Sequence, residues 1–360
     1  MADQITFQHV TSANDHKGVV AITKIEHAAS GFKAYAYQCS LEEDLDGAPK
    51  AYGMNNAHPV DQARNPDTVF QHDIEMLETS LCNATSPHEN CDAGNHDFAW
   101  VGVFAATQDF AARHGFSIDR RAFLEARRRT LPGGGSAPLA PNEPGLFPAV
   151  QGGAAPAPGY FVSTTSAITD PDIQEWEQMR YVNAVAVPYA AWAGWWHSLG
   201  VDKGDFGLAI RPSTGAFSGF VFADTGTGRV GEVSRKLFET LSSDRNNEDR
   251  FLFLVFPRSG VGTADFKKFT QEPVVQTQAK AIIRKLSDVP SSDALVQFLS
   301  LGADRGKFRS FASGRGQIDT GSEEGDPLYW NVLRALMDCG YSEGSASADV
   351  VIDGRRFTGV

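Results

Sequence analysis

Residues 203–241, KGDFGLAIRPSTGAFSGFVFADTGTGRVGEVSRKLFETL, decide how the rest of the chain is interpreted. They hold two short apolar runs, at residues 206–210 and 217–223, which are joined by the turn sequence Pro-Ser-Thr-Gly at 212–215. Apolar runs joined by a turn with an early proline and a late glycine predict a β-hairpin. The stretch therefore predicts two buried strands followed by a glycine-rich loop.

Two carboxylates flank that loop. Asp224 ends the second apolar run, and Glu232 follows eight residues later, where Val233, Leu237 and Leu241 have the spacing of a helix. A strand end and a helix start can direct both carboxylates into one cleft. Cleavage of a glycosidic bond needs such a pair, one acid to protonate the leaving oxygen and one carboxylate to activate water or attack. Ordinary turn and helix-start chemistry also accounts for these two residues.

Further short segments follow one another in the order found in a known enzyme family. They are residues 44–52, 155–166, 180–189, 204–207, 224–226, 231–234 and 256–260. With these segments, which together lie within residues 30–262, the chain resembles glycoside hydrolase family 75, the chitosanases, and in particular its bacterial members. The resemblance implies an endo-acting hydrolase of β-1,4-linked amino-sugar polymers, with chitosan as the first substrate to expect.

The resemblance also implies the two essential carboxylates, an Asp in a Gly-Asp-Thr loop and a Glu in a Gly-Glu-Ala-Ser segment. They correspond to Asp224 and Glu232, although this chain has Ala223 before the aspartate, Val233 after the glutamate and a shorter loop between them. We expect Glu232 to be the general acid and Asp224 the base that activates water. The resemblance implies inversion, for which the two carboxyl groups stand about 6.5–9.5 Å apart.

The other candidate site residues belong to the segments that resemble the family. The substrate-binding candidates are Asp205, Asp44, Asp46, Tyr52, Thr164 and Thr165. The resemblance places Asp44 and Asp46 at the active cleft, whereas an Asx-type turn is the alternative use of both. Asp205 alternatively holds a turn by accepting backbone hydrogen bonds. No metal or organic cofactor is expected.

Composition limits the other possibilities. The chain of 360 residues has a net charge of −12, which argues against nucleic acid as a partner and favours a cationic polymer such as chitosan. No run of about 18 apolar residues is present, so we expect no membrane span. No signal peptide is visible at the N-terminus, so we expect a cytoplasmic protein or export by a non-classical route. Cys82 and Cys91 bracket a polar loop and would pair only in an oxidising place.

Many short strands separated by turns predict an α+β fold with a β-barrel core, similar to double-psi barrels, and peripheral helices. We expect a catalytic domain at residues 1–286, with a Pro/Gly-rich insertion at 131–158, and a C-terminal accessory region at 287–360. The strongest helix predictions are residues 272–286, 291–301 and 325–337.

Several interpretations stay open at this level. Trp192, Trp195 and Trp196 form either a hydrophobic staple at the end of the barrel or a platform on which sugar rings stack. A peptidoglycan-cleaving enzyme, delivered by a secretion machine or a phage, is the alternative activity. A carbohydrate-binding barrel that has kept the loop without catalysis is the alternative to an enzyme.

Overall fold

The computed structural model of the chain describes residues 4–51, 140, 151, 154–157, 162–226, 228–242, 249–260, 270–289, 292–301, 327–342 and 350–357. The chain divides into two compact units. Met1–Asp44 and Val185–Val360 form the first, which we call the sheet unit, and Leu45–Ala184 form the second, which we call the inserted unit. The sheet unit is therefore assembled from two separate parts of the sequence.

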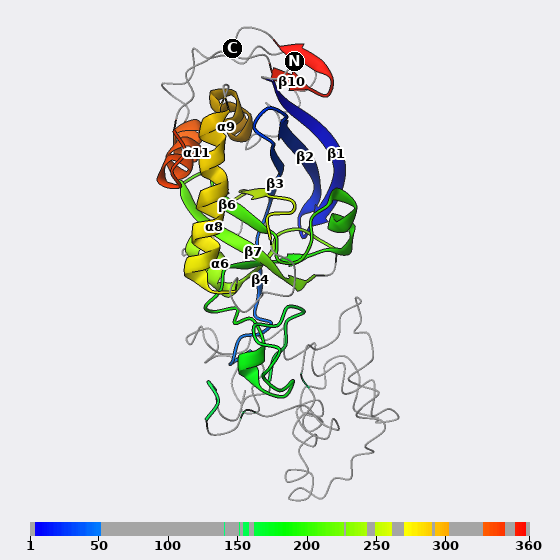
Figure 1. The fold of residues 1–360 in the computed structure, drawn as a ribbon, viewed down its shortest axis with the longest axis vertical. Coiled ribbons are helices and arrows are strands. Elements are labelled where there is room, and N and C mark those ends of the chain that lie inside the picture. Colours follow the sequence, from blue (N-terminus) through cyan, green and yellow to red (C-terminus); the bar gives the residue numbers. More distant parts are fainter. Residues whose placement is uncertain are drawn as a thin grey trace, which may run out of the picture. The chain divides into compact units, whose positions relative to one another are not determined.

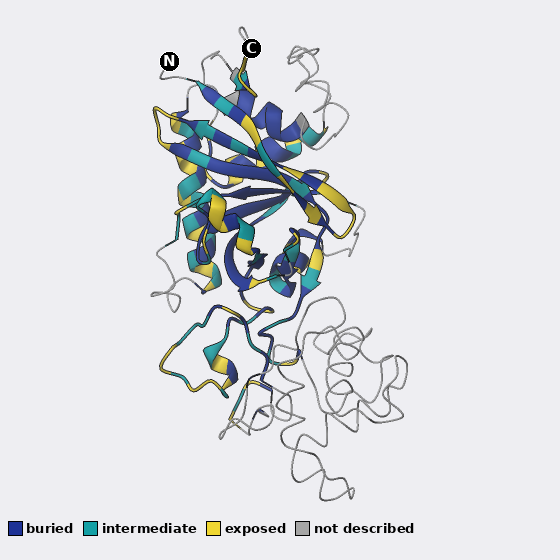
Figure 2. Cartoon of the chain, turned by 90° about the vertical axis from the view of Figure 1, so that its right-hand side faces the viewer, coloured by how far each residue is buried: buried dark blue, intermediate teal, exposed yellow. Residues whose placement is uncertain are grey.

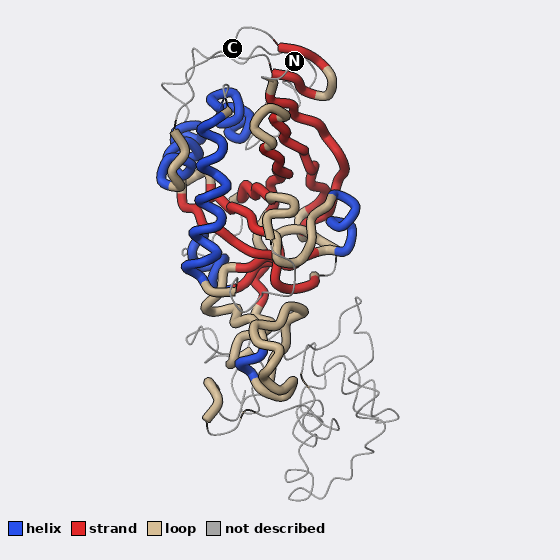
Figure 3. The backbone as a smooth tube through the Cα atoms, viewed as in Figure 1, coloured by secondary structure: helices blue, strands red, loops and turns tan. Residues whose placement is uncertain are grey.

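The sheet unit is built on one mixed sheet of eleven strands (Figures 1 and 3). In chain order these are β1 (Ile5–Asp15), β2 (Gly18–His27), β3 (Phe32–Cys39), β4 (Glu42–Asp44), β5 (Tyr189–Trp192), β6 (Phe206–Arg211), β7 (Ala216–Thr225), β8 (Glu232–Ser234), β9 (Phe251–Val255), β10 (Val350–Ile352) and β11 (Arg355–Phe357). Their order across the sheet is β11-β10-β1-β2-β3-β9-β6-β7-β5-β8-β4. Among the described residues, β1–β10, β4–β8 and β5–β7 are parallel pairs.

The helices of the sheet unit follow from amphipathic or apolar runs along the chain. They are α6 (Arg235–Leu241), α8 (Glu272–Arg284), α9 (Ser292–Leu301) and α11 (Pro327–Asp338), with the 3-10 helices η2 (Gly194–Leu199) and η4 (Lys285–Asp288). The three helices predicted from residue 272 onward are confirmed, as is the mixed α+β class. No helix within the described ranges is both long and apolar enough to span a membrane.

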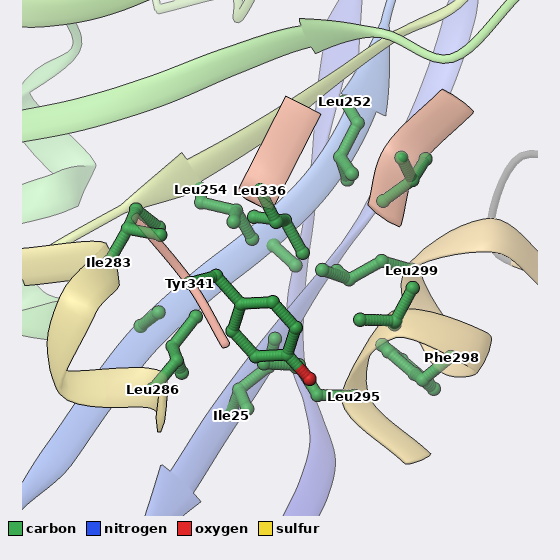
Figure 4. Packing of buried hydrophobic residues seen from close by; sticks show 14 of the residues in the cluster. Ile25, Leu252, Leu254, Ile283, Leu286, Leu295, Phe298, Leu299, Leu336 and Tyr341 are labelled. Carbon is green, nitrogen blue, oxygen red and sulfur yellow. The ribbon is translucent and has the colours of Figure 1, made fainter. Parts of the chain in front are cut away.

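One hydrophobic cluster joins the N-terminal strands to the C-terminal helices (Figure 4). The residues labelled there are Ile25, Leu252, Leu254, Ile283, Leu286, Leu295, Phe298, Leu299, Leu336 and Tyr341. They come from β2, β9, α8, η4, α9 and α11 and from the chain just after α11. Figure 2 shows buried residues in both the strands and the helices of the sheet unit. We predicted an accessory region from residue 287 onward, and its role stays a prediction, but these elements share a core with β1–β3.

A second cluster holds the tryptophan segment. Trp196 is 1% exposed, and its ring lies 6.1 Å from that of Tyr35 and 5.9 Å from that of Phe222, measured between centroids. The indole nitrogens of the half-buried Trp192 and Trp195 donate to backbone carbonyls at 3.0 Å in each case. This packing supports the staple interpretation of the segment.

The described part of the inserted unit is organised by one buried glutamine. The side chain of Gln178, in η1 (Gln178–Arg180), donates to the carbonyls of Gly47 and Ser163 at 2.8 and 3.0 Å. Its oxygen accepts the backbone N–H of Ser163 at 2.9 Å. The amide therefore ties the segment after residue 45 to the segments around 163 and 178. Cys82 and Cys91, and most of residues 131–158, lie outside the described residues.

Candidate active site

The hairpin predicted from the sequence places Asp224. Strands β6 and β7 pair antiparallel, from Phe206 with Val221 to Arg211 with Ala216, so this prediction is confirmed. Asp224 lies one residue before the end of β7 and is 7% exposed. Its carboxylate is therefore held at the end of a buried strand.

A β-bulge sets the direction of Asp224. Strand β5 pairs with β7 in parallel, but the register shifts, so that Ala190 faces Phe222 while the next residue, Ala191, faces Asp224. Ala223 is the extra residue in β7. The bulge turns the Asp224 side chain to the same face of the sheet as Ala191. Bulges are frequent beside active sites because they redirect a side chain in this way.

The prediction that Glu232 opens a helix is wrong. Glu232 is the first residue of strand β8, and helix α6 begins only at Arg235. Ser234 ends the strand and caps the helix, because its side chain accepts a backbone N–H from the first turn at 3.3 Å. The strand forms because Gly231, with a φ of +96°, lets the chain pass close to the carbonyl oxygen of Ser40.

Strand pairing brings Asp44 to the face of Glu232. In the parallel pair of β4 and β8, Asp44 lies in register with Ser234, and Glu42 lies in register with Glu232. Side chains alternate along a strand, and residues in register share a face. The Asp44 and Glu232 side chains therefore leave the sheet on the same face.

The pairing of β5 brings Asp224 to this face as well. Ala190 of β5 pairs with Val233 of β8, so the next residue, Ala191, lies on the face of Glu232. Because Asp224 is the register partner of Ala191, its carboxylate shares that face. Asp44, Asp224 and Glu232, from β4, β7 and β8, thus lie on one side of the sheet, together with the exposed Glu42 of β4.

Two of these carboxylates lie close together. A carboxylate oxygen of Asp44 and one of Asp224 are within 4.8 Å of each other, and the two residues are 8% and 7% exposed. The buried phenol of Tyr189 donates a hydrogen bond to Asp44 Oδ2 at 3.0 Å. We did not predict Tyr189 as a site residue. The available signal was its place in the segment at 180–189, since a buried tyrosine normally keeps its hydroxyl in a hydrogen bond.

The Glu232 carboxylate lies against the loop that follows Asp224. A Cβ atom added at Gly226 would stand 2.3 Å from Glu232 Oε2, so the carboxylate fills the space beside this glycine. Gly226 is the second residue after Asp224. The structure therefore brings the carboxylate of Glu232 to the loop that begins at Asp224. Glu232 itself is half-buried.

Asp205 holds a loop of the sheet unit. Its carboxylate accepts backbone N–H groups of Asp202 at 2.9 Å, Arg258 at 3.0 Å and Gly260 at 2.8 Å. Burial raises the pKa of Asp205 above its usual value, and these backbone hydrogen bonds act in the opposite direction. The turn-holding use of Asp205 is confirmed, while its use in substrate binding stays a prediction.

The remaining candidates belong to the inserted unit. Asp46 and Thr164 are half-buried there. The hydroxyl of Thr165 donates to a backbone carbonyl at 2.6 Å and accepts a backbone N–H at 3.0 Å, so it supports this unit's own backbone. Tyr52 lies outside the described residues. Their roles in substrate binding stay predictions.

The carboxylates of Asp44, Asp224 and Glu232 give this face the groups for acid and base chemistry. Oxygens of Asp44 and Asp224 are also the kind that hard cations prefer, but two carboxylates alone do not make a metal site. No model of a known protein family matches the chain, and no curated protein matches it. The chemistry proposed below therefore depends on the residues and their geometry.

Proposed function

We propose that the protein is an endo-acting glycoside hydrolase that cleaves β-1,4-linked amino-sugar polymers, with chitosan as its first substrate. The observation that supports this proposal most directly is the gathering of Asp224 and Glu232. They come from different strands, lie on one face of the sheet, and the Glu232 carboxylate contacts the loop that starts at Asp224. Two carboxylates so arranged are the minimum that glycosidic cleavage needs.

Glu232 is the general acid in this proposal. It is half-buried, so part of its side chain stays accessible to a substrate. It donates its proton to the oxygen of the leaving sugar as the glycosidic bond breaks.

Asp224 is the general base. It removes a proton from a water molecule that attacks the anomeric carbon on the face opposite the leaving group, which inverts the configuration. Asp44 places a second carboxylate beside Asp224, and the Tyr189 phenol holds Asp44 in place. Two neighbouring negative groups on this face also favour a cationic sugar such as glucosamine over a neutral one.

The proposal includes a finer statement about the fold. We propose that the sheet closes as a double-psi-like barrel around the second hydrophobic cluster. The mixed sheet supports this, because the parallel pairs β4–β8 and β5–β7 flank the site while the hairpin of β6 and β7 is antiparallel. Fold likeness alone is a weaker argument for function than the site.

The test is release of reducing ends from chitosan and from purified peptidoglycan, measured side by side. We expect turnover of chitosan, and a loss of about 100-fold or more in kcat for Glu232→Gln and for Asp224→Asn. Glu239→Gln is the matched control, because this exposed carboxylate lies in α6, one turn of helix beyond Arg235. It should leave kcat unchanged.

Three outcomes separate the alternatives. Turnover of peptidoglycan alone would keep the two carboxylates and change the substrate. Turnover of chitosan that survives both substitutions would refute the assignment of the carboxylates. No turnover of either polymer would refute the proposed activity and leave carbohydrate binding as the alternative.

A further inference from the structure

We propose that Gly226 is a positioning residue for the Glu232 carboxylate, an inference that rests on the function proposed above. The absence of a side chain at Gly226 creates the space in which this carboxylate lies. The loop after Asp224 thus leaves the space that the carboxylate of the proposed general acid occupies. This gives the loop between the two carboxylates a role that its sequence alone does not indicate.

Two side chains, those of Glu232 and Ala191, occupy the space beside Gly226. A Cβ atom there would stand 2.3 Å from Glu232 Oε2 and 3.4 Å from Glu232 Cδ. It would also stand 3.0 Å from the Cβ atom of Ala191, the residue that pairs with Asp224. Of these neighbours, only the end of the Glu232 side chain can move easily. A methyl group at position 226 would therefore displace the carboxylate.

The backbone does not require glycine at this position. Gly226 is not in the left-handed region, in contrast to Gly231 with its φ of +96°. Its N–H donates to the carbonyl of Trp192 at 3.0 Å, a bond that alanine also makes. Glycine at 226 is therefore explained by the Glu232 carboxylate, which is the closer neighbour, and by the Cβ atom of Ala191. An alanine there is expected to fold.

Displacement of the acid should reduce catalysis more than binding. The acid has to be within hydrogen-bond reach of the leaving oxygen in the transition state. A misplacement of 1 Å costs about 100-fold in rate in well-oriented sites. We therefore expect Gly226→Ala to lower kcat on chitosan by about 100-fold, with little change in KM.

The experiment is a double-mutant cycle in kcat between Gly226→Ala and Glu232→Asp. If the methyl group acts only by displacing the carboxylate, it should cost little once Glu232 is replaced by the shorter aspartate. The double variant should then have nearly the kcat of Glu232→Asp alone. Gly194→Ala is the control, because its added Cβ would meet no atom within 4 Å and its backbone is not left-handed.

Equal fold-losses for Gly226→Ala in the two backgrounds would overturn the inference, because they would indicate a general effect on the fold. A kcat for Gly226→Ala equal to that of Gly194→Ala would overturn it as well. Crystal structures of the parent protein and Gly226→Ala give a reading that needs no activity. A Glu232 carboxylate moved away from residue 226 supports the inference, and an unmoved one refutes it. Failure of the parent to cleave either polymer would refute the proposed function. The two crystal structures test the positioning of the Glu232 carboxylate independently of that function.

Discussion

At the scale of single residues, one buried hydroxyl connects distant parts of the chain. The phenol of Tyr189 donates to Asp44, 145 positions away, and Asp44 lies within 4.8 Å of Asp224. Tyr189→Phe removes a donor from a buried carboxylate, which should lower the free energy of unfolding by about 2 kcal/mol. We also expect a lower kcat on chitosan, because Asp44 would shift beside the proposed base.

Tyr35→Phe is the matched control for this prediction. The Tyr35 phenol is also buried and donates to the carbonyl of Leu199 at 2.8 Å, but it contacts none of the three acidic residues in the described contacts. Its loss should reduce stability and leave kcat unchanged, as measured by denaturant titration and by reducing-end assay. If both substitutions lower kcat equally, the Tyr189 hydroxyl supports the fold alone.

Asp15 makes the stability of the sheet unit sensitive to acid. Burial alone would raise the pKa of Asp15, but hydrogen bonds from the backbone of Ser40 and Lys17 and the charge of Arg250 bring it below the usual value of 3.8. A depressed pKa adds stability that is fully present at neutral pH and is lost as the pH falls below 3.8 and through the folded-state pKa.

Asp15→Asn should therefore lower the free energy of unfolding at pH 7. It should also make that free energy depend less on pH in the acidic range. Arg250 Nη1 lies 2.7 Å from Asp15 Oδ2, and breaking such a pair costs about 3 kcal/mol. Urea titrations at several pH values between 2 and 7 measure this. An equal slope of unfolding free energy against pH in the parent and the variant would show that Asp15 is not a source of the acid sensitivity.

At the scale of elements, the short strand β8 depends on one close approach. A Cβ atom at Gly231 would stand 2.2 Å from the carbonyl oxygen of Ser40, and the backbone there is left-handed. Gly231→Ala should lower the free energy of unfolding by about 3 kcal/mol or more. It should also shift Glu232, which is the next residue.

Gly31→Ala separates the two causes of this loss. Gly31 has a φ of +67°, but an added Cβ would meet nothing within 4 Å, so it has the backbone strain without the collision. We expect a cost of about 1 kcal/mol and an unchanged kcat. Thermal unfolding and the reducing-end assay measure both. Equal losses of stability in the two variants would mean that the backbone moves easily to avoid the collision with Ser40.

The elements also show what the sequence was able to predict. The hairpin of β6 and β7 and helix α8 were predicted because each depends on local signals, namely apolar runs with a Pro/Gly turn or helical spacing. Strand β8 was predicted as a helix start, because its three residues become a strand only by pairing with β4 and β5. Periodicity within a short window contains no information about such distant partners.

The same limit applies to the site. Asp224 and Glu232 were predicted from one stretch and are brought together by β5, β7 and β8. The contribution of Tyr189 and the fit of Glu232 against Gly226 depend on register and on a bulge at Ala223, which no pattern in the sequence indicated. The sequence indicated the chemical groups and that Asp224 and Glu232 flank one loop, whereas it did not indicate the strand pairing that places them.

At the scale of the whole molecule, the C-terminal helices contribute to the core of the sheet unit. Leu336 of α11 is fully buried in the cluster that contains Leu254 of β9 (Figure 4). Leu336→Ala should therefore lower the free energy of unfolding by about 3 kcal/mol. We expect faster hydrogen exchange at the amides of β9, because α11 and β9 would open together.

The same substitution also tests the predicted accessory region at 287–360. If that region unfolds by itself, the variant should show a separate early transition and unchanged protection of β9. Met337→Ala is the control, because this neighbouring side chain is half-exposed and its loss should leave exchange in β9 unchanged.

The division of the sheet unit in sequence has a consequence for how the protein is made. Asp44 leaves the ribosome long before Tyr189 and Asp224, and the whole inserted unit is synthesised between them. The sheet neighbours of β1 and β3 are β10 and β9, which are synthesised much later. The outer edges of β1 and β3 therefore stay unpaired, and accessible to other chains, during translation. Slow codons or chaperone binding while the inserted unit emerges would therefore affect the yield of folded protein more than its final stability.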